Sequence, residues 1–95
     1  MRYVWDPAKD LLNKRKHGLF LEDGIAALED PGRDFWVDDR FDYGEVRIVT
    51  MGRKMQSLLV VGSTEVISMV EGDEIIRIIS VREANKPEHH WFNFG

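Results

Sequence analysis

The sequence predicts a small α+β fold, because helix-type spacing of apolar residues changes near residue 45 to short, strand-like runs. In the first 30 residues, apolar positions recur at intervals of three and four, as in amphipathic helices. Later runs are rich in valine and isoleucine and are separated by turn residues. The 95 residues suffice for a single domain, 1–95. We expect a small, mainly antiparallel sheet with two N-terminal helices and a short C-terminal helix, the helices covering one face.

The first helix is predicted by its end residues as well as by its apolar spacing. It would run from Pro7 to His17, since Asp6 suits the N-cap and Gly18 suits the position after the last helical residue. Proline is tolerated in the first turn, where its missing N–H costs nothing. A short strand is expected before this helix, at residues 3–5.

A second helix and an edge strand are expected before the main sheet. The helix would span about residues 21–29, and Asp30-Pro31 would end it, because a residue before proline disfavours the α conformation. The edge strand would lie at residues 34–38.

The second half of the chain is predicted to form the sheet and a terminal helix. Strand-like runs occur at residues 45–51, 57–63, 66–70 and 75–81. The first two would form a hairpin across the loop 52–56, and the third would continue or bulge from the second. A turn at 71–74 would follow. The last run is expected to be central, because it is apolar on both faces apart from Arg77 and Ser80. A short helix is expected from Ala84 onwards, with a proline tolerated in its first turn.

Charge is distributed unevenly along the chain. The formal net charge of −4 counts against a nucleic-acid binder, since such proteins are usually basic. Residues 1–18 hold five cations and two acids, residues 19–45 hold two cations and nine acids, and residues 46–95 hold six of each. The acidic middle is either a solvated loop and helix face or a surface that repels RNA or meets a basic partner, while the N-terminal region can carry a cationic patch.

Several classes of protein and site are disfavoured. The chain has no cysteine, so it can form neither a disulfide nor a thiolate metal site. Its apolar runs fall far short of the ~20 residues that span a bilayer, and its first residues lack an apolar signal segment, so we expect a cytoplasmic protein. The histidines His17, His89 and His90 show no metal-ligand spacing, so neither a metal site nor a cofactor is expected.

The polar side of the first helix is one candidate site. Four residues recur there at helical intervals: Lys9, Asn13, Lys16 and His17. A mostly cationic face of this kind can bind RNA phosphates, and an imidazole is the side chain that most often acts as a general acid or base. The alternative is that His17 only interacts with the C-terminus of its own helix.

Arginines within strands form a second candidate site. Arg77 interrupts an isoleucine-rich run, and Arg47 is similarly placed in its own strand. A guanidinium in such a position must be paired or must face a cleft. It can bind a phosphodiester through a bidentate fork; the alternative is an internal ion pair, to Glu45 or Glu65. If the last strand is regular to its end, Arg77 and Arg82 face opposite sides.

Two sets of residues carry a more specific signal than composition does. The N-terminal half contains Trp5-Asp6-Pro7, Lys9, Asn13 and Lys16-His17-Gly18, and the C-terminal half contains Ile76-Arg77-Ile78-Ile79-Ser80, Arg82 and Ala84. Over about residues 3–90, the chain thereby resembles BrnT-type toxins, which are similar to RelE-like ribonucleases. The resemblance implies a RelE-like fold and the toxin of a type II toxin–antitoxin pair, a metal-independent endoribonuclease that cleaves RNA and inhibits translation.

The resemblance also implies partners and residue roles. A cognate DNA-binding antitoxin would hold the toxin in a hetero-oligomer, which would reach operator DNA only through the antitoxin. The cleavage site would draw on Lys9, His17, Arg47, Arg77 and Arg82. Metal-free RNA cleavage uses the adjacent 2′-hydroxyl as nucleophile and needs proton transfer and cations. His17 or Glu65 would transfer protons, the three arginines would hold the phosphate, and Ser80 would orient a neighbour.

Two other functions stay open at this point. A catalytically weakened homologue would bind the antitoxin and co-repress without cutting RNA. The acidic segment 22–45, the aromatic residues near the C-terminus and the few basic residues of the last helix favour this alternative. A metal-dependent hydrolase would use the histidines and the pair Asp38-Asp39, but no ligand spacing recurs among them.

Overall fold

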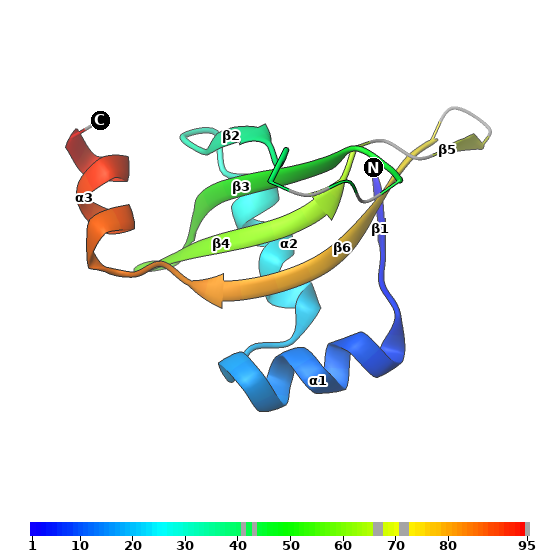
Figure 1. Cartoon of the computed structure of the whole chain (residues 1–95), viewed down its shortest axis with the longest axis horizontal. Coiled ribbons are helices and arrows are strands. Elements are labelled where there is room, and N and C mark those ends of the chain that lie inside the picture. Colours follow the sequence, from blue (N-terminus) through cyan, green and yellow to red (C-terminus); the bar gives the residue numbers. More distant parts are fainter. Residues whose placement is uncertain (41, 43, 66–67, 71–72, 95) are drawn as a thin grey trace.

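The computed structural model describes residues 1–40, 42, 44–65, 68–70 and 73–94 and shows a twisted sheet with helices on both sides (Figure 1). The strands are β1 (Arg2–Val4), β2 (Asp34–Val37), β3 (Arg47–Lys54), β4 (Ser57–Thr64), β5 (Ser68–Val70) and β6 (Asp73–Glu83). The helices are α1 (Pro7–His17), the 3₁₀ turn η1 (Leu21–Asp23), α2 (Gly24–Leu28) and α3 (Lys86–Phe94). The strand order is β1-β6-β4-β3-β2, and β5 pairs with the start of β6.

The sheet is mixed, so the expectation of a mainly antiparallel sheet is corrected. The pairs β2–β3, β3–β4, β4–β6 and β5–β6 are antiparallel, but β1 runs parallel to β6, with Tyr3 opposite Ile76. No short turn joins β1 to β6, so local sequence does not set their relative direction. The middle strand of this order is β4, not β6, which contains the 75–81 run. β6 lies beside β4, and β1 pairs with only its first part.

Some predicted boundaries hold and others move. The edge strand expected at 34–38 is confirmed as β2. The hairpin loop expected at 52–56 is shorter, because Lys54 pairs with Ser57 and leaves only two residues in the turn. The run expected at 66–70 is a strand at 68–70, while residues 66–67, and residues 71–72 of the expected turn, lie outside the described residues.

The predicted first helix is confirmed together with both of its caps. The Asp6 carboxylate accepts a hydrogen bond from the Ala8 amide at 2.9 Å, and Gly18 adopts a left-handed φ of 77° that ends the helix. The helix is fastened to the sheet through Asn13. The Asn13 side chain donates to the Val81 carbonyl at 2.9 Å and accepts from the Val81 amide at 3.1 Å.

The predicted second helix is split, so that expectation is corrected. Instead of one helix over 21–29, a 3₁₀ turn precedes a short α-helix. Gly24 stands at the junction, and a Cβ there would lie only 2.8 Å from a methyl of Val81. Close packing on β6 therefore requires glycine at this point, and glycine is a poor helix former.

The two faces of the sheet have separate cores. The face covered by α1, η1 and α2 buries Leu21, Ala27, Leu59, Val61, Ile78 and Val81. The opposite face buries Met51, Leu58 and Val60, against which Phe92 of α3 packs. The expectation that all helices cover one face is therefore wrong: α3 covers one end of the other face, at the end of the sheet opposite to β5 (Figure 1).

A β-bulge changes the direction of side chains along β6. Gly62 lies opposite Ser80, while the next residue, Ser63, lies opposite Ile78, so Ile79 is an extra residue in β6. Side chains alternate along a strand, and the extra residue therefore places Ile78 and Val81 on the same buried face. Arg77 and Arg82, their neighbours, both point to the other face. This corrects the expectation that the two arginines face opposite sides.

Candidate nucleic-acid interface

All three arginines predicted for the site lie on the face of the sheet that α1 and α2 leave uncovered. We call this face the open face. Arg47 belongs to β3, and Arg77 and Arg82 belong to β6 on the other side of β4. Their side chains are 27–39% exposed, so all three are held by the protein and remain accessible. The bulge at Ile79 brings Arg77 and Arg82 to the same face.

Glu45 connects two of these arginines. Its Oε1 lies 2.6 Å from Nη2 of Arg77 and 3.5 Å from Nε of Arg47. Gly44, directly before it, has a left-handed φ of 70°, a conformation that glycine adopts without strain. This confirms the alternative of an internal ion pair for Arg77 and identifies Glu45, not Glu65, as its partner.

Arg82 is held by the first turn of α3. Its two terminal nitrogens donate to the two carboxylate oxygens of Glu88 at 2.7 and 2.8 Å, a bidentate pair. These hydrogen bonds raise the pKa of Arg82 and lower the pKa of Glu88, in each case outweighing partial burial. The Asn85 amide also donates to Glu88 at 2.9 Å, so the orientation of Arg82 depends on the start of α3.

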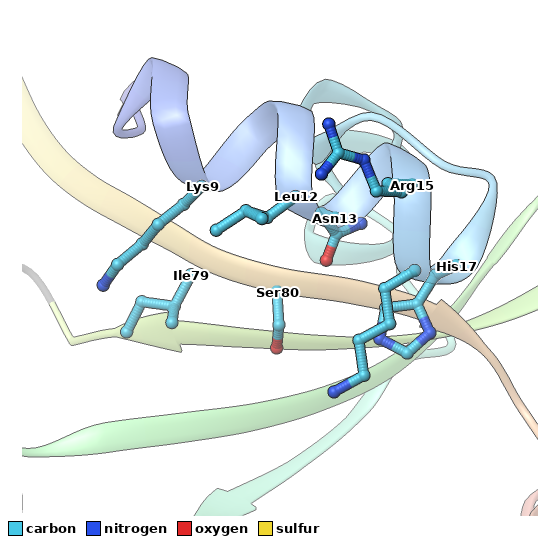
Figure 2. Close-up of a pocket in the computed structure, with 8 residues that line it drawn as sticks. Lys9, Leu12, Asn13, Arg15, His17, Ile79 and Ser80 are labelled. Carbon is cyan, nitrogen blue, oxygen red and sulfur yellow. The ribbon is translucent and has the colours of Figure 1, made fainter.

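A cationic cleft lies between α1 and the edge of β6 that β1 does not reach. It has a volume of about 500 Å³ and is lined by Lys9, Leu12, Asn13, Arg15, Lys16, His17, Ile79 and Ser80. Figure 2 shows Lys9 and His17 at opposite ends of this α1 cleft, with Ile79 and Ser80 between them. Five of the predicted site residues thus share one cleft, although Asn13 is buried and its side chain binds backbone groups.

A second cleft, of about 310 Å³, lies on the open face. Its lining includes Gly62 of β4, Ser80 and Arg82 of β6, and Glu88 of α3, together with Asp38, Asp39 and Arg40 after β2. Ser80 lines both clefts, so they meet at this residue. The Ser80 hydroxyl covers Gly62, where a Cβ would lie 2.6 Å from Oγ. The α1 cleft and the cleft on the open face are therefore neighbours that share Ser80.

Glu65 is not brought to either cleft. It is exposed at the end of β4 and lines a different pocket, together with Tyr3, Ile48 and Ser63. Ser63 and Ile48 alternate with the open-face residues of their strands, so this pocket belongs to the helix-covered face.

Two functional candidates were missed by reasoning from the sequence. From the sequence, Glu45 is expected only as an ion-pair partner, and Glu88 contributes to the family resemblance without a role of its own. Glu45 is 32 residues from Arg77 in the chain, so no local spacing signals their contact. The pair Arg82 and Glu88 spans the turn between β6 and α3, whose geometry the sequence pattern does not specify.

The described part of the chain offers neither a metal cluster nor a membrane helix. Among the described residues, no group of three or more His, Cys, Asp or Glu side chains is arranged to hold a metal ion. Within the same part of the chain, no helix combines the length and apolar character needed to cross a membrane.

Comparison with known proteins identifies a family. A family model described as "Ribonuclease toxin, BrnT, of type II toxin-antitoxin system" matches residues 5–88. The match covers both motif-bearing halves of the chain and confirms the resemblance inferred from them. No individually curated protein matches the chain.

Proposed function

Since the chain belongs to the BrnT family of ribonuclease toxins of type II toxin–antitoxin systems, we propose that it is a RelE-like, metal-independent endoribonuclease that cleaves RNA in the cytoplasm and thereby inhibits translation. A cognate DNA-binding antitoxin holds it in a hetero-oligomer, and the complex reaches operator DNA through the antitoxin. One observation carries the proposal of RNA cleavage: Arg47, Arg77 and Arg82 share the open face, whose cleft adjoins the cationic α1 cleft at Ser80.

The two clefts suggest a path for an RNA strand. Lys9 and Lys16 bind backbone phosphates in the α1 cleft, and the strand passes Ser80 to reach the open face. There Arg47 and Arg77, which meet beside Thr64, hold the phosphate at which the chain is cut, and Arg82, which lies opposite Val60 further along β4, binds a neighbouring phosphate. When the 2′-hydroxyl attacks that phosphate, the guanidinium groups stabilise the added negative charge of the transition state. Asn13 contributes by positioning α1.

The residues proposed for proton transfer differ in their support. His17 lines the α1 cleft together with the lysines, so it can meet a bound RNA strand. Glu65 lines a pocket on the helix-covered side of the sheet, whereas the arginines lie on the open face. Of these two residues, His17 is therefore the one that lies along the proposed path of the RNA strand.

The test is RNA cleavage by the purified chain in the presence of EDTA. Wild-type protein should cut, and Arg77→Ala should cut at least ~100-fold more slowly with an unchanged melting temperature. Arg33→Ala is the matched control, because Arg33 is exposed and stacks on Phe35 outside both clefts. Absence of cleavage by folded wild-type protein would contradict the proposed activity.

One observation favours the alternative of a weakened, antitoxin-binding homologue. Arg47, Arg77 and Arg82 each contact a carboxylate of the same chain, which competes with an RNA phosphate. Growth of cells expressing the toxin without its antitoxin separates the two functions. Growth arrest that depends on Arg77 supports the ribonuclease, and unimpaired growth supports the binding module.

A further inference from the structure

We propose that Glu45 is a catalytic residue, the carboxylate that removes the proton from the attacking 2′-hydroxyl. This inference rests on the proposed ribonuclease function and supplies the proton acceptor that the reaction needs. The geometry points to it: Glu45 is a solvent-accessible carboxylate in contact with both Arg47 and Arg77, the two arginines that would hold the phosphate at this end of the open face.

This end of the open face is firmly built. β4 lies between β3 and β6, and its last residue, Thr64, pairs with Arg47. Thr64 is 1% exposed, and its hydroxyl accepts a hydrogen bond from the Arg77 amide at 3.1 Å. The backbones that carry both arginines are therefore fixed relative to each other, and Glu45, which directly precedes β3, contacts both of them through its side chain.

The contacts of Glu45 leave part of its carboxylate for a substrate. Both arginines contact Oε1, whereas Oε2 is not used in either contact. The side chain is 32% exposed, so a ligand on the open face can reach it. A guanidinium can bind a carboxylate and a phosphate through different N–H groups, since it has five. A phosphate held by Arg47 or Arg77 would thus lie beside Glu45.

Other candidates for the proton acceptor are less well placed relative to these arginines. Glu65 lines a pocket on the helix-covered face. His17 lines the α1 cleft at the edge of β6, while Arg47 lies on β3, beyond both β6 and β4. Glu88 is already engaged through both oxygens by Arg82. Glu45 combines contact with the phosphate-binding arginines and a carboxylate oxygen that they do not use.

The proposed step conserves atoms and charge. The Glu45 carboxylate takes the proton of the 2′-hydroxyl while the 2′-oxygen forms a bond to phosphorus, and the bond from phosphorus to the 5′-oxygen breaks. The leaving 5′-oxygen takes a proton from water. The hydroxide formed is neutralised by the proton that Glu45 then releases. The products are a 2′,3′-cyclic phosphate end and a 5′-hydroxyl end, and the carboxylate is regenerated.

Glu45→Gln tests the step, because glutamine keeps the size of the side chain and an oxygen that can accept from Arg77, but it is not a base. We expect single-turnover RNA cleavage to fall at least ~100-fold, the range typical of proton-transfer groups. Affinity for a fully 2′-O-methylated RNA, which lacks the nucleophile, should be unchanged or higher because a negative charge is removed. Glu74→Gln, an exposed site on β6 with the same change of charge, should cleave like the wild type.

A second variant distinguishes loss of the base from misfolding or displacement of the arginines. Glu45→Ala removes the side chain, and added formate should restore part of the cleavage, whereas chloride at the same ionic strength should not. The proposal is overturned if Glu45→Gln cleaves at the wild-type rate or faster, which would make Glu45 a counter-ion only. It is also overturned if cleavage and binding of the 2′-O-methylated RNA fall together, or if Glu65→Gln alone loses activity. Inactive wild-type protein would instead reject the ribonuclease function itself.

Discussion

Asn13 binds Val81 as a neighbouring β-strand would, donating to its carbonyl at 2.9 Å and accepting from its amide at 3.1 Å. The interaction lies where β1 no longer accompanies β6, since β1 ends with Val4 opposite Arg77. One side chain thus satisfies both backbone groups of a buried strand residue. It also sets the distance between α1 and β6, and with it the width of the α1 cleft.

Asn13→Ala should therefore destabilise the protein by about 1–3 kcal/mol, because it leaves backbone groups of Val81 buried without partners. Urea denaturation followed by circular dichroism would measure the loss. Asn93→Ala is the control: Asn93 is exposed and its side chain accepts a surface hydrogen bond from Arg53, so its effect should stay within about 0.5 kcal/mol. Equal effects of the two substitutions would argue against the role assigned to Asn13.

The pair of Arg82 and Glu88 should make stability depend on pH in the acid range. The hydrogen bonds from Arg82 lower the pKa of Glu88 in the folded protein, so the unfolded chain takes up a proton first as the pH falls. The stabilisation is fully present above the usual carboxyl pKa and is lost as the pH falls through the lower, folded pKa. Glu88→Gln should cost about 1 kcal/mol at pH 7, a modest value because Arg82 is 39% exposed, and progressively less in acid.

Thermal melts of wild-type protein and Glu88→Gln across pH 3–7 would check this. Glu83→Gln serves as the control, since Glu83 is exposed and Arg82 donates to its backbone carbonyl, which the substitution leaves in place. A difference between wild type and Glu88→Gln that stays constant down to the lowest pH would show that the carboxylate charge is not what stabilises α3.

The lysines of the α1 cleft should contribute to RNA affinity without contributing to sequence preference. Replacing both Lys9 and Lys16 with alanine should weaken binding of 2′-O-methylated RNA about equally for different sequences. It should also reduce the slope of log K against log salt by ~0.7 for each phosphate that the variant no longer neutralises. Fluorescence anisotropy over a range of salt concentrations gives both quantities.

Lys86→Ala is the control for the double substitution, because Lys86 is exposed at the start of α3 and lines neither cleft. An unchanged salt slope in the double variant would show that RNA does not bind in the α1 cleft. It would not bear on the arginines, which Arg77→Ala tests separately.

The parts of the fold that the sequence predicted correctly are those encoded by neighbours in the chain. Asp6, Pro7 and Gly18 act within the helix that they delimit, and their effect is visible in a window of a few residues. The same holds for the β3–β4 hairpin, whose strands are joined by a short turn. Part of the lining of the α1 cleft could also be predicted from the sequence, because residues at helical spacing lie on the same side of a helix.

The parts that were not predicted depend on interactions between distant residues. The direction of β1 is set by β6, more than 70 residues later in the chain, and the split of the second helix is set by the packing of Gly24 against Val81. The partners of the arginines belong to the same class. A guanidinium within a strand signals that a partner exists, but only the folded chain selects Glu45 for Arg77.

Because β6 contains one extra residue, its length determines whether Arg77 and Arg82 lie on the same face of the sheet. The part of β6 after Ile79 is held by Asn13 and by α3, through Val81 and Arg82. Deleting Ile79 would restore simple alternation and turn Arg77 toward the helix-covered face, away from Arg82, without altering a single charged residue. In a relative of this chain that lacks one residue at this point, the arginines would therefore lie on opposite faces of the sheet, even if every arginine were retained.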